Sequence, residues 1–187
     1  CSDTAELAFT DVFVPDDHRL GSGEGSGFLN AYKSLTVDRI FTAALALLRM
    51  EDNRQSPALG PLAVTGATGG VGPLAIAIFA KAGYEVHAIS GKGDQAGYLS
   101  SLGASTVLGR EALSTTRPMD AARFGGGLDN VGGPMLAALL AQTAPYGNVA
   151  SAGLAASHEL HATVMPFIIR GVSLLGVASA GTARDLR

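Results

Sequence analysis

The 187-residue sequence contains one cysteine and no tryptophan, and only 16% of its residues are charged. A single cysteine, Cys1, excludes an intrachain disulfide framework and a zinc site built from several thiolates. The net charge of −3 gives no electrostatic reason to expect nucleic acid as the main partner. A hydrophobic content of 47% is too high for a disordered chain. The composition therefore favours a compact α/β protein.

Two long uncharged stretches, residues 55–80 and 130–157, are each long enough to span a bilayer. Glycines and prolines cut both stretches into short pieces, which is typical of a parallel sheet covered on both faces. The first residues are polar and acidic where a secretory signal would be basic. We therefore expect no membrane partner and a cytoplasmic location.

The first forty residues differ in texture from the rest of the chain. Apolar residues within 7–14 predict a strand, and the glycine- and serine-rich run 21–27 predicts a flexible loop. Apolar residues then recur at helical spacing, which predicts a helix from Phe28 to about Met50. Together these segments form a short strand–loop–helix appendage.

The rest of the sequence alternates between predicted strands and predicted helices. Strands are predicted at 62–65, 85–90, 105–108, 128–131, 148–152 and 172–177, and helices at 74–81, 95–102, 111–124, 135–144 and 164–170. This alternation implies βαβ units with right-handed crossovers. We therefore expect a Rossmann-type, doubly wound parallel sheet of six strands.

The run LAVTGATGGVG (62–72) lies where the first of these strands turns into a helix. It fits the dinucleotide fingerprint G-x-G-x-x-G, with Ala67 in the place of the first glycine. Gly69 would let the backbone approach a pyrophosphate, and the N–H groups of Gly70 and Val71 would face the phosphates. An ordinary tight turn is the alternative.

The end of the second predicted strand indicates which cofactor is expected. NAD sites usually place a carboxylate there, whereas this sequence has Ser90-Gly91-Lys92. A hydroxyl and an ammonium group suit a 2′-phosphate, and Arg110, just past the third strand, should add a second cation. Solvated surface charge is the alternative for both cations. The pattern favours NADP over NAD.

The same glycines also fit the pattern of short-chain dehydrogenases, T-G-x-x-x-G-x-G. Catalysis in that family needs a Tyr-x-x-x-Lys pair, in which the lysine activates the tyrosine as proton donor. None of the three lysines, Lys33, Lys81 and Lys92, follows a tyrosine at that spacing. The short-chain alternative therefore lacks its catalytic pair.

Seven stretches from Phe41 onward carry a family resemblance: FTAALALLRMEDN, VTGATGGVG, AISGKG, YLSSLGASTVLGRE, LDNVGG, VASAGLA and TVMPFIIRGVSLLGV. In this order they resemble the zinc-independent quinone oxidoreductase branch of the medium-chain dehydrogenase/reductases. Within that branch, the chain is most similar to the acryloyl-CoA reductase type. The resemblance implies hydride transfer from NADPH to the activated C=C bond of an enoyl-CoA or to a quinone-like acceptor.

The resemblance also implies residue roles, but no catalytic or metal residue within the chain. The implied cofactor contacts are Thr68, Gly69, Gly70 and Val71 at the pyrophosphate, Ser90, Gly91, Lys92 and Arg110 at the 2′-phosphate, and Leu154, Ile168 and Ser179 toward the nicotinamide. Lys92 stands where the family commonly has arginine, so the bidentate fork is lost and a weaker NADP preference is expected. The strand at 172–177 resembles the edge that pairs across a two-fold axis, which implies a homodimer.

Members of this family carry a separate N-terminal catalytic domain, for which we find no counterpart in the sequence. Residues 2–40 instead resemble, through SDTAELAFTDVFVPDDHRLGSGEGSGF, part of an acyl-CoA dehydrogenase, from which no site residue is carried over. These resemblances divide the chain into residues 1–40 and an NADP-binding Rossmann domain, 41–187. We expect the chain by itself to bind cofactor and to reduce little substrate. A non-catalytic nucleotide-binding or assembly module is the alternative.

Two further features have both a functional and a structural interpretation. His158-Glu159-x-His161 could suggest a metal site, but it lacks a third ligand and is predicted to lie in a surface loop. Asp129, at the tip of the fourth strand, could either face the ligand crevice or cap the helix that follows.

Overall fold

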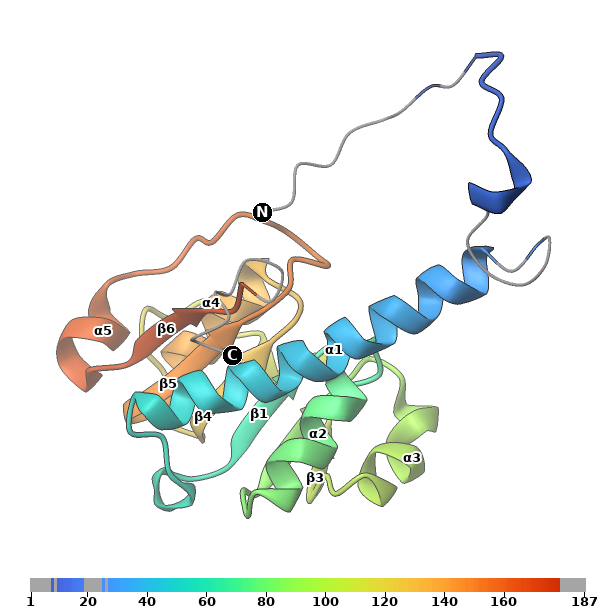
Figure 1. The fold of residues 1–187 in the computed structure, drawn as a ribbon. Coiled ribbons are helices and arrows are strands. Elements are labelled where there is room, and N and C mark those ends of the chain that lie inside the picture. The colour runs from blue at the N-terminus through green and yellow to red at the C-terminus, as the bar shows by residue number, and fades with distance from the viewer. Residues whose placement is uncertain (1–7, 9, 19–24, 26, 179–187) are drawn as a thin grey trace.

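The computed structural model describes residues 8, 10–18, 25 and 27–178 and contains a parallel sheet (Figure 1). Its six strands lie in the order β3-β2-β1-β4-β5-β6. They are β1 (Leu62–Thr65), β2 (Val86–Ile89), β3 (Thr106–Leu108), β4 (Phe124–Asp129), β5 (Thr143–Ser151) and β6 (Ser173–Gly176). The helices are α1 (Gly27–Asp52), α2 (Gly72–Lys81), α3 (Ala96–Ser101), α4 (Gly133–Ala141) and α5 (Met165–Arg170), with 3-10 turns η1 (Asp16–His18), η2 (Pro57–Leu59), η3 (Gly93–Gln95) and η4 (Arg110–Leu113). The predicted Rossmann-type sheet is confirmed.

Side chains of successive residues in a strand point to opposite faces of the sheet, so each face has its own core, and helices cover both faces. Leu62 and Val64 of β1 belong to one core, together with buried residues of α1, α2 and α3. Ala63, which lies between them, belongs to the other core, with residues of η4, α4 and α5. The result is a three-layer domain with α1 and α2 together on one face (Figure 1).

The fourth strand lies earlier in the sequence than predicted. Residues 128–131 are predicted as this strand, whereas β4 covers Phe124–Asp129 and includes three consecutive buried glycines. A Cβ added to Gly127 would lie 2.5 Å from the carbonyl oxygen of Ala63 in β1. Neighbouring backbone therefore comes too close for a side chain here, and a run that looks like a turn is a central strand.

The prediction of a helix at 111–124 is wrong. Helical backbone is confined to η4, and irregular backbone leads from there to β4. The Ser114 hydroxyl donates to the Glu111 carbonyl over 2.7 Å, a local bond of the kind that competes with helix formation. Pro118 removes a further backbone donor from the same segment.

The neighbouring elements, α4 and β5, also differ from the predicted bounds. The helix ends at Ala141 rather than at residue 144, and β5 begins at Thr143 rather than at residue 148. The guanidinium of Arg170 in α5 donates to the carbonyl oxygens of Ala141 and Thr143 over 3.0 Å each. A side chain from distant sequence thus satisfies the carbonyls where the helix gives way to the strand, which sequence periodicity cannot reveal.

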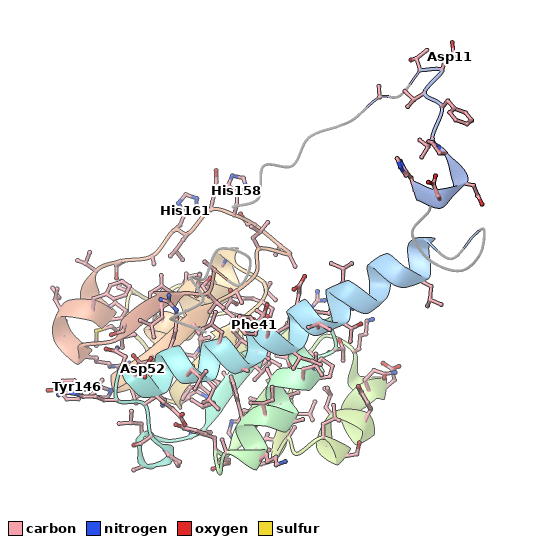
Figure 2. All side chains as sticks on the ribbon, viewed as in Figure 1. Asp11, Phe41, Asp52, Tyr146, His158 and His161 are labelled. Atoms are coloured by element: carbon pink, nitrogen blue, oxygen red, sulfur yellow. The ribbon has the colours of Figure 1, made fainter. Side chains whose placement is uncertain are left out.

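The predicted strand at 7–14 is absent from its described part. Residues 10–15 form bends and irregular backbone before η1, while Leu7 and Phe9 lie outside the described residues. Phe13 is 87% exposed, and the segment lies well away from the sheet, as the position of Asp11 shows (Figure 2). An isolated strand with no neighbour to pair with gains little from extended backbone.

The helix α1 joins the appendage to the sheet without a break (Figure 1). Figure 2 labels Phe41 and Asp52, which bound the half that lies along the domain. In this half Ala43, Ala46 and Met50 have no exposed surface. Neither α1 nor any other described helix combines the length and the apolar character that spanning a bilayer requires.

Buried amides fix the loop after α1 to the sheet. The Gln55 side-chain oxygen accepts hydrogen bonds from the backbone N–H and the side-chain amide of Asn148 in β5, each over 3.0 Å. The Gln55 side-chain nitrogen donates to the Gly125 carbonyl in β4, also over 3.0 Å. Asn148 donates in turn to the Asn53 carbonyl over 3.2 Å. The end of α1 is thereby held to two adjacent strands.

Replacing Gln55 by alanine is expected to lower the free energy of unfolding by roughly 2–4 kcal/mol, because buried groups of Asn148 and Gly125 lose their partners. Denaturant-induced unfolding followed by circular dichroism measures this change. Gln95→Ala is the matched control, since the Gln95 side chain bonds an exposed neighbour, Asp94. Equal stabilities for the two variants would show that the buried amides do not hold α1.

Candidate functional site

The carboxyl ends of β1 and β4 lie side by side, and the chain leaves them toward opposite faces of the sheet. Open α/β sheets hold their ligands at such a switch point. A cavity of about 360 Å³ opens here. Among its lining are six residues predicted for the cofactor: Thr68, Gly69, Ser90, Gly91, Lys92 and Arg110. Gly70 and Val71, the other two residues of the predicted pyrophosphate turn, connect the cavity wall to α2.

The glycine turn after β1 is shaped by close backbone contacts. Gly66 has a φ of +58°, and its carbonyl accepts a hydrogen bond from the Gly69 N–H over 2.8 Å. A Cβ added to Gly72 would lie 2.5 Å from the carbonyl oxygen of Ala67. No side chain of the described residues caps the start of α2. The first N–H groups of α2 thus form the kind of helix start that binds anions.

The ends of β2 and β3 add a hydroxyl and two cations to the cavity. The buried Ser90 hydroxyl accepts the Lys92 N–H over 3.0 Å and lies 3.3 Å from the Thr68 hydroxyl. A Cβ added to Gly91 would lie 2.6 Å from the Arg110 Nε, so this arginine crosses directly over Gly91. Lys92 and Arg110 are both exposed at the mouth of the cavity. Their charges suit a phosphate group.

Asp129 ends β4 with no exposed surface. One carboxylate oxygen accepts the Thr65 hydroxyl, and the other accepts the Gly132 N–H, each over 2.7 Å. The Thr65 hydroxyl oxygen also accepts the Asn130 N–H over 2.9 Å. The carboxylate thereby holds the turn before α4, but it bonds the N–H of the residue that precedes the helix, and within the described residues no side chain caps α4 itself. Burial raises the pKa of Asp129 and outweighs these hydrogen bonds, which lower it.

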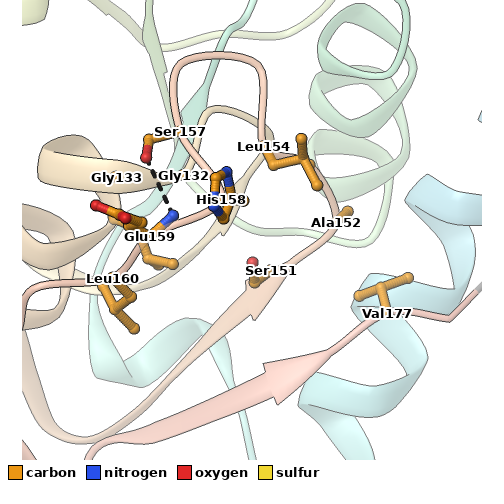
Figure 3. A pocket seen from close by; sticks show the side chains of 12 residues that line it. Gly132, Gly133, Ser151, Ala152, Leu154, Ser157, His158, Glu159, Leu160 and Val177 are labelled. Carbon is orange, nitrogen blue, oxygen red and sulfur yellow. Dashed lines mark hydrogen bonds between the residues drawn. The ribbon is translucent and has the colours of Figure 1, made fainter. Parts of the chain in front are cut away.

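A second cavity, of about 260 Å³, lies over the carboxyl ends of β5 and β6. Figure 3 shows Leu154, His158 and Val177 around it. Leu154, predicted for the nicotinamide end, is therefore close to the switch point. Ile168, predicted for the same end, is 74% exposed on α5 and lines neither cavity. Ser179 lies outside the described residues.

Besides Gly66 and Ile89, which lie next to predicted residues in the sequence, four residues that line the first cavity were not predicted: Val131, Met135, Ala155 and Ala156. Val131 and Met135 follow β4, and the two alanines follow β5, so all four lie near the carboxyl edge of the sheet. That position is the signal that could have found them. Their small or apolar side chains carry no chemical signature of their own.

His158, Glu159 and His161 lie on the loop between β5 and α5, where Figure 2 labels the two histidines. Glu159 and His161 form an exposed pair with 3.1 Å between carboxylate and ring nitrogen. Within the described ranges, no three His, Cys, Asp or Glu side chains gather closely enough to hold a metal ion. These residues therefore do not fit a zinc centre.

Comparison with known families places the chain among dehydrogenases. The profile of the zinc-binding dehydrogenase family matches residues 70–186, which is more than half of the sequence. The protein therefore belongs to the zinc-binding dehydrogenase family. Zinc appears in the family name, but within the described residues no group of three His, Cys, Asp or Glu side chains could hold it.

Individual relatives agree with this assignment. Acrylyl-CoA reductase AcuI of Ruegeria pomeroyi is 48% identical over 74% of this chain and 43% of its own length. YhfP of Bacillus subtilis, named as a candidate quinone oxidoreductase, is 46% identical over 79% of this chain and 45% of its own, and its structure with NAD bound has a TM-score of 0.76. The yhdH oxidoreductase of Salmonella enterica, solved with NADP, has a TM-score of 0.77 at 44% identity over 79% of this chain and 46% of its own.

These relatives confirm the resemblance to the acryloyl-CoA reductase and quinone oxidoreductase branch. The chain spans less than half the length of each of the three proteins, between 43% and 46%. The similarity therefore covers the nucleotide-binding fold described above, on which the predicted site lies.

The raised pKa of Asp129 predicts a specific dependence of stability on pH. In the window above the ordinary pKa of 3.8, the folded chain binds more protons at Asp129 than the unfolded chain does. Its contribution to the free energy of unfolding is therefore present below that value and is lost as pH rises through the window. Asp129→Asn removes this contribution.

Urea unfolding of both proteins between pH 4 and pH 7 tests the prediction. The free energy of unfolding of Asp129→Asn, relative to the wild type, should rise with pH, because all other titrating groups are shared. Parallel curves would contradict a raised pKa at this position, because a constant offset between the two proteins would reflect only the altered hydrogen bonds to Thr65 and Gly132.

Proposed function

We propose that the chain is the NADP(H)-binding part of an oxidoreductase that reduces an activated C=C bond. The observation that carries this proposal is the cavity at the switch point between β1 and β4. In it an uncapped helix start, a hydroxyl and two cations converge on one space. The yhdH structure with NADP and the curated name of AcuI support it.

The residues of this cavity and of the turn that leads from it to α2 would contact the proposed ligand at two phosphate regions. Thr68, Gly69, Gly70 and Val71 would hold the diphosphate at the start of α2, where backbone N–H groups favour negative charge. Ser90, Gly91, Lys92 and Arg110 would hold the 2′-phosphate at the ends of β2 and β3. Leu154, Ile168 and Ser179 remain predictions for the nicotinamide end. The cofactor, when bound, supplies the hydride, and the residues of this chain bind and orient it.

The acceptor in the proposed reaction is the activated C=C bond of an enoyl-CoA, or a quinone-like molecule. This part of the proposal rests on the names of AcuI and YhfP and on the resemblance in sequence. The second cavity, which contains Leu154 and His158, lies over the carboxyl ends of β5 and β6 at the same edge of the sheet and offers a space for the acceptor.

Replacing Lys92 by alanine is expected to weaken NADPH binding about tenfold, because a charge-assisted contact to the 2′-phosphate is lost. Binding of NADH, which lacks that phosphate, should stay unchanged. Calorimetric or fluorescence titration of the purified chain with each nucleotide measures both constants. Lys81→Ala is the control, since Lys81 is also exposed but lies at the far end of α2. Equal losses for NADPH and NADH would contradict the role of Lys92 at the 2′-phosphate.

We also propose that residues 1–40 form a unit distinct from the NADP-binding domain at 41–187. Burial supports this division: between residues 35 and 40 no side chain is buried, whereas burial begins just after Phe41. The backbone does not mark the boundary, because α1 runs through it. A cytoplasmic location remains a prediction of the sequence.

We propose a homodimer formed through β6, which stands at the end of the strand order. Val177 donates its N–H to Ser151 of β5 over 3.0 Å, so the preceding N–H, of Gly176, points away from β5 and toward a partner. Within the described residues no strand pairs with this edge of β6, and such an edge is a ready template for pairing.

Sedimentation equilibrium of the wild type is expected to give twice the chain mass of 18.9 kDa. Gly176→Pro should give the single-chain mass, because proline removes the outward N–H. Gly176→Ala should remain dimeric, since it keeps that N–H and an added Cβ meets no atom within 4 Å. A monomeric wild type, or a dimeric proline variant, would argue against pairing through β6.

A further inference from the structure

Arg39 of α1 lies directly over the glycine turn that precedes α2. A Cβ added to Gly70 would lie 2.7 Å from the Nε and 3.1 Å from the Cζ of Arg39. The guanidinium thus fills the space that any side chain at position 70 would take. Gly70 is exposed and precedes the first residue of α2, Gly72, by two positions.

Helix packing explains why Arg39 reaches this place. Arg39 precedes Ala43 by four residues, and Ala46 and Met50 continue the same stripe at spacings of three and four. These three apolar residues have no exposed surface and share a core with Val71 at the start of α2. The buried stripe therefore fixes the rotation of α1 and directs residue 39 toward the turn. Arg39 itself is half-buried.

We propose that Arg39 binds the diphosphate of the dinucleotide. This inference rests on the proposed function, in which the same turn receives that diphosphate. A guanidinium offers five N–H donors in a planar fork that matches two phosphate oxygens, and it keeps its charge at all relevant pH values. At this place it adds a positive side chain to the backbone N–H groups at the start of α2.

The position of Arg39 complements the two cations already described. Lys92 and Arg110 stand at the ends of β2 and β3, on the proposed 2′-phosphate side of the cavity. Arg39 stands at the start of α2, on the proposed diphosphate side. Positive charge is then distributed along the whole phosphate-bearing part of one ligand. Arg39 lies two residues before Phe41, the first residue of the proposed NADP-binding domain, so the part of α1 upstream of that boundary would itself contribute to the cofactor site.

Two ligands separate the role of Arg39 from the rest of the site. NADPH carries both the diphosphate and the 2′-phosphate, whereas adenosine 2′-monophosphate carries only the latter. Arg39→Ala is expected to weaken NADPH binding about tenfold and to leave the affinity for adenosine 2′-monophosphate unchanged. Arg39→Met, which keeps the aliphatic stem, should show the same loss, and Arg39→Lys should show a smaller one.

Titrations at one ionic strength, with circular dichroism of each variant, make the test decisive. Arg49→Ala removes the same charge from an exposed position on α1 and should leave both affinities unchanged. Unchanged or tighter NADPH binding by Arg39→Met would overturn the proposal, and tighter binding would mean that the guanidinium blocks the turn. Equal losses for both ligands would also overturn it. A wild-type chain that binds neither NADPH nor NADH would instead refute the proposed function itself.

Discussion

The close contact between β1 and β4 is the constraint on which the candidate site depends. Gly127 leaves no room for a side chain next to Ala63, and the Thr65 hydroxyl joins the strand ends by donating to Asp129. Because the chain leaves these two strands toward opposite faces, their contact also creates the crevice. Widening the contact would disturb the sheet and the cavity together, which ties the stability of the domain to the shape of the site.

Around this crevice each polar group is positioned by a different strand. The turn after β1 presents the start of α2, the end of β2 presents Ser90, and the segment after β3 presents Arg110. Glycines let two arginines come close to backbone: Arg110 crosses Gly91, and Arg39 crosses Gly70. A side chain in place of either glycine would collide with the guanidinium above it, so each glycine leaves room for its arginine. Glycine thus has two roles around the crevice: it lets backbone segments approach each other, and it leaves room for the arginine side chains.

The parts of the fold that repeat a local pattern could be predicted from the sequence. For the strand at 62–65 and the turn that follows, the apolar pattern, the glycines and the helix after them all indicate the same strand–turn–helix unit. Sequence patterns place β4 too late because three glycines suggest a turn, and only the neighbouring backbone reveals why they are there. The segment after η4 is not a helix, because local hydrogen bonds such as that of Ser114 compete with helix formation and Pro118 removes a donor. Of the predicted site, six members share one cavity because strand order brings them there, while Ile168 lies elsewhere on α5.

The long helix α1 connects the two proposed parts of the chain and belongs to both of them. The proposed division lies near residue 40, yet the helix crosses this point without a break and places Arg39 at the glycine turn. The packing of Ala43 and Ala46 sets the rotation of α1 about its own axis. Because the helix is continuous, the same rotation decides which way Arg39, about one helical turn earlier, points. Cutting the chain at the proposed boundary would therefore remove a side chain that lies beside the proposed diphosphate site. On this reasoning the functional unit begins within α1, upstream of residue 41.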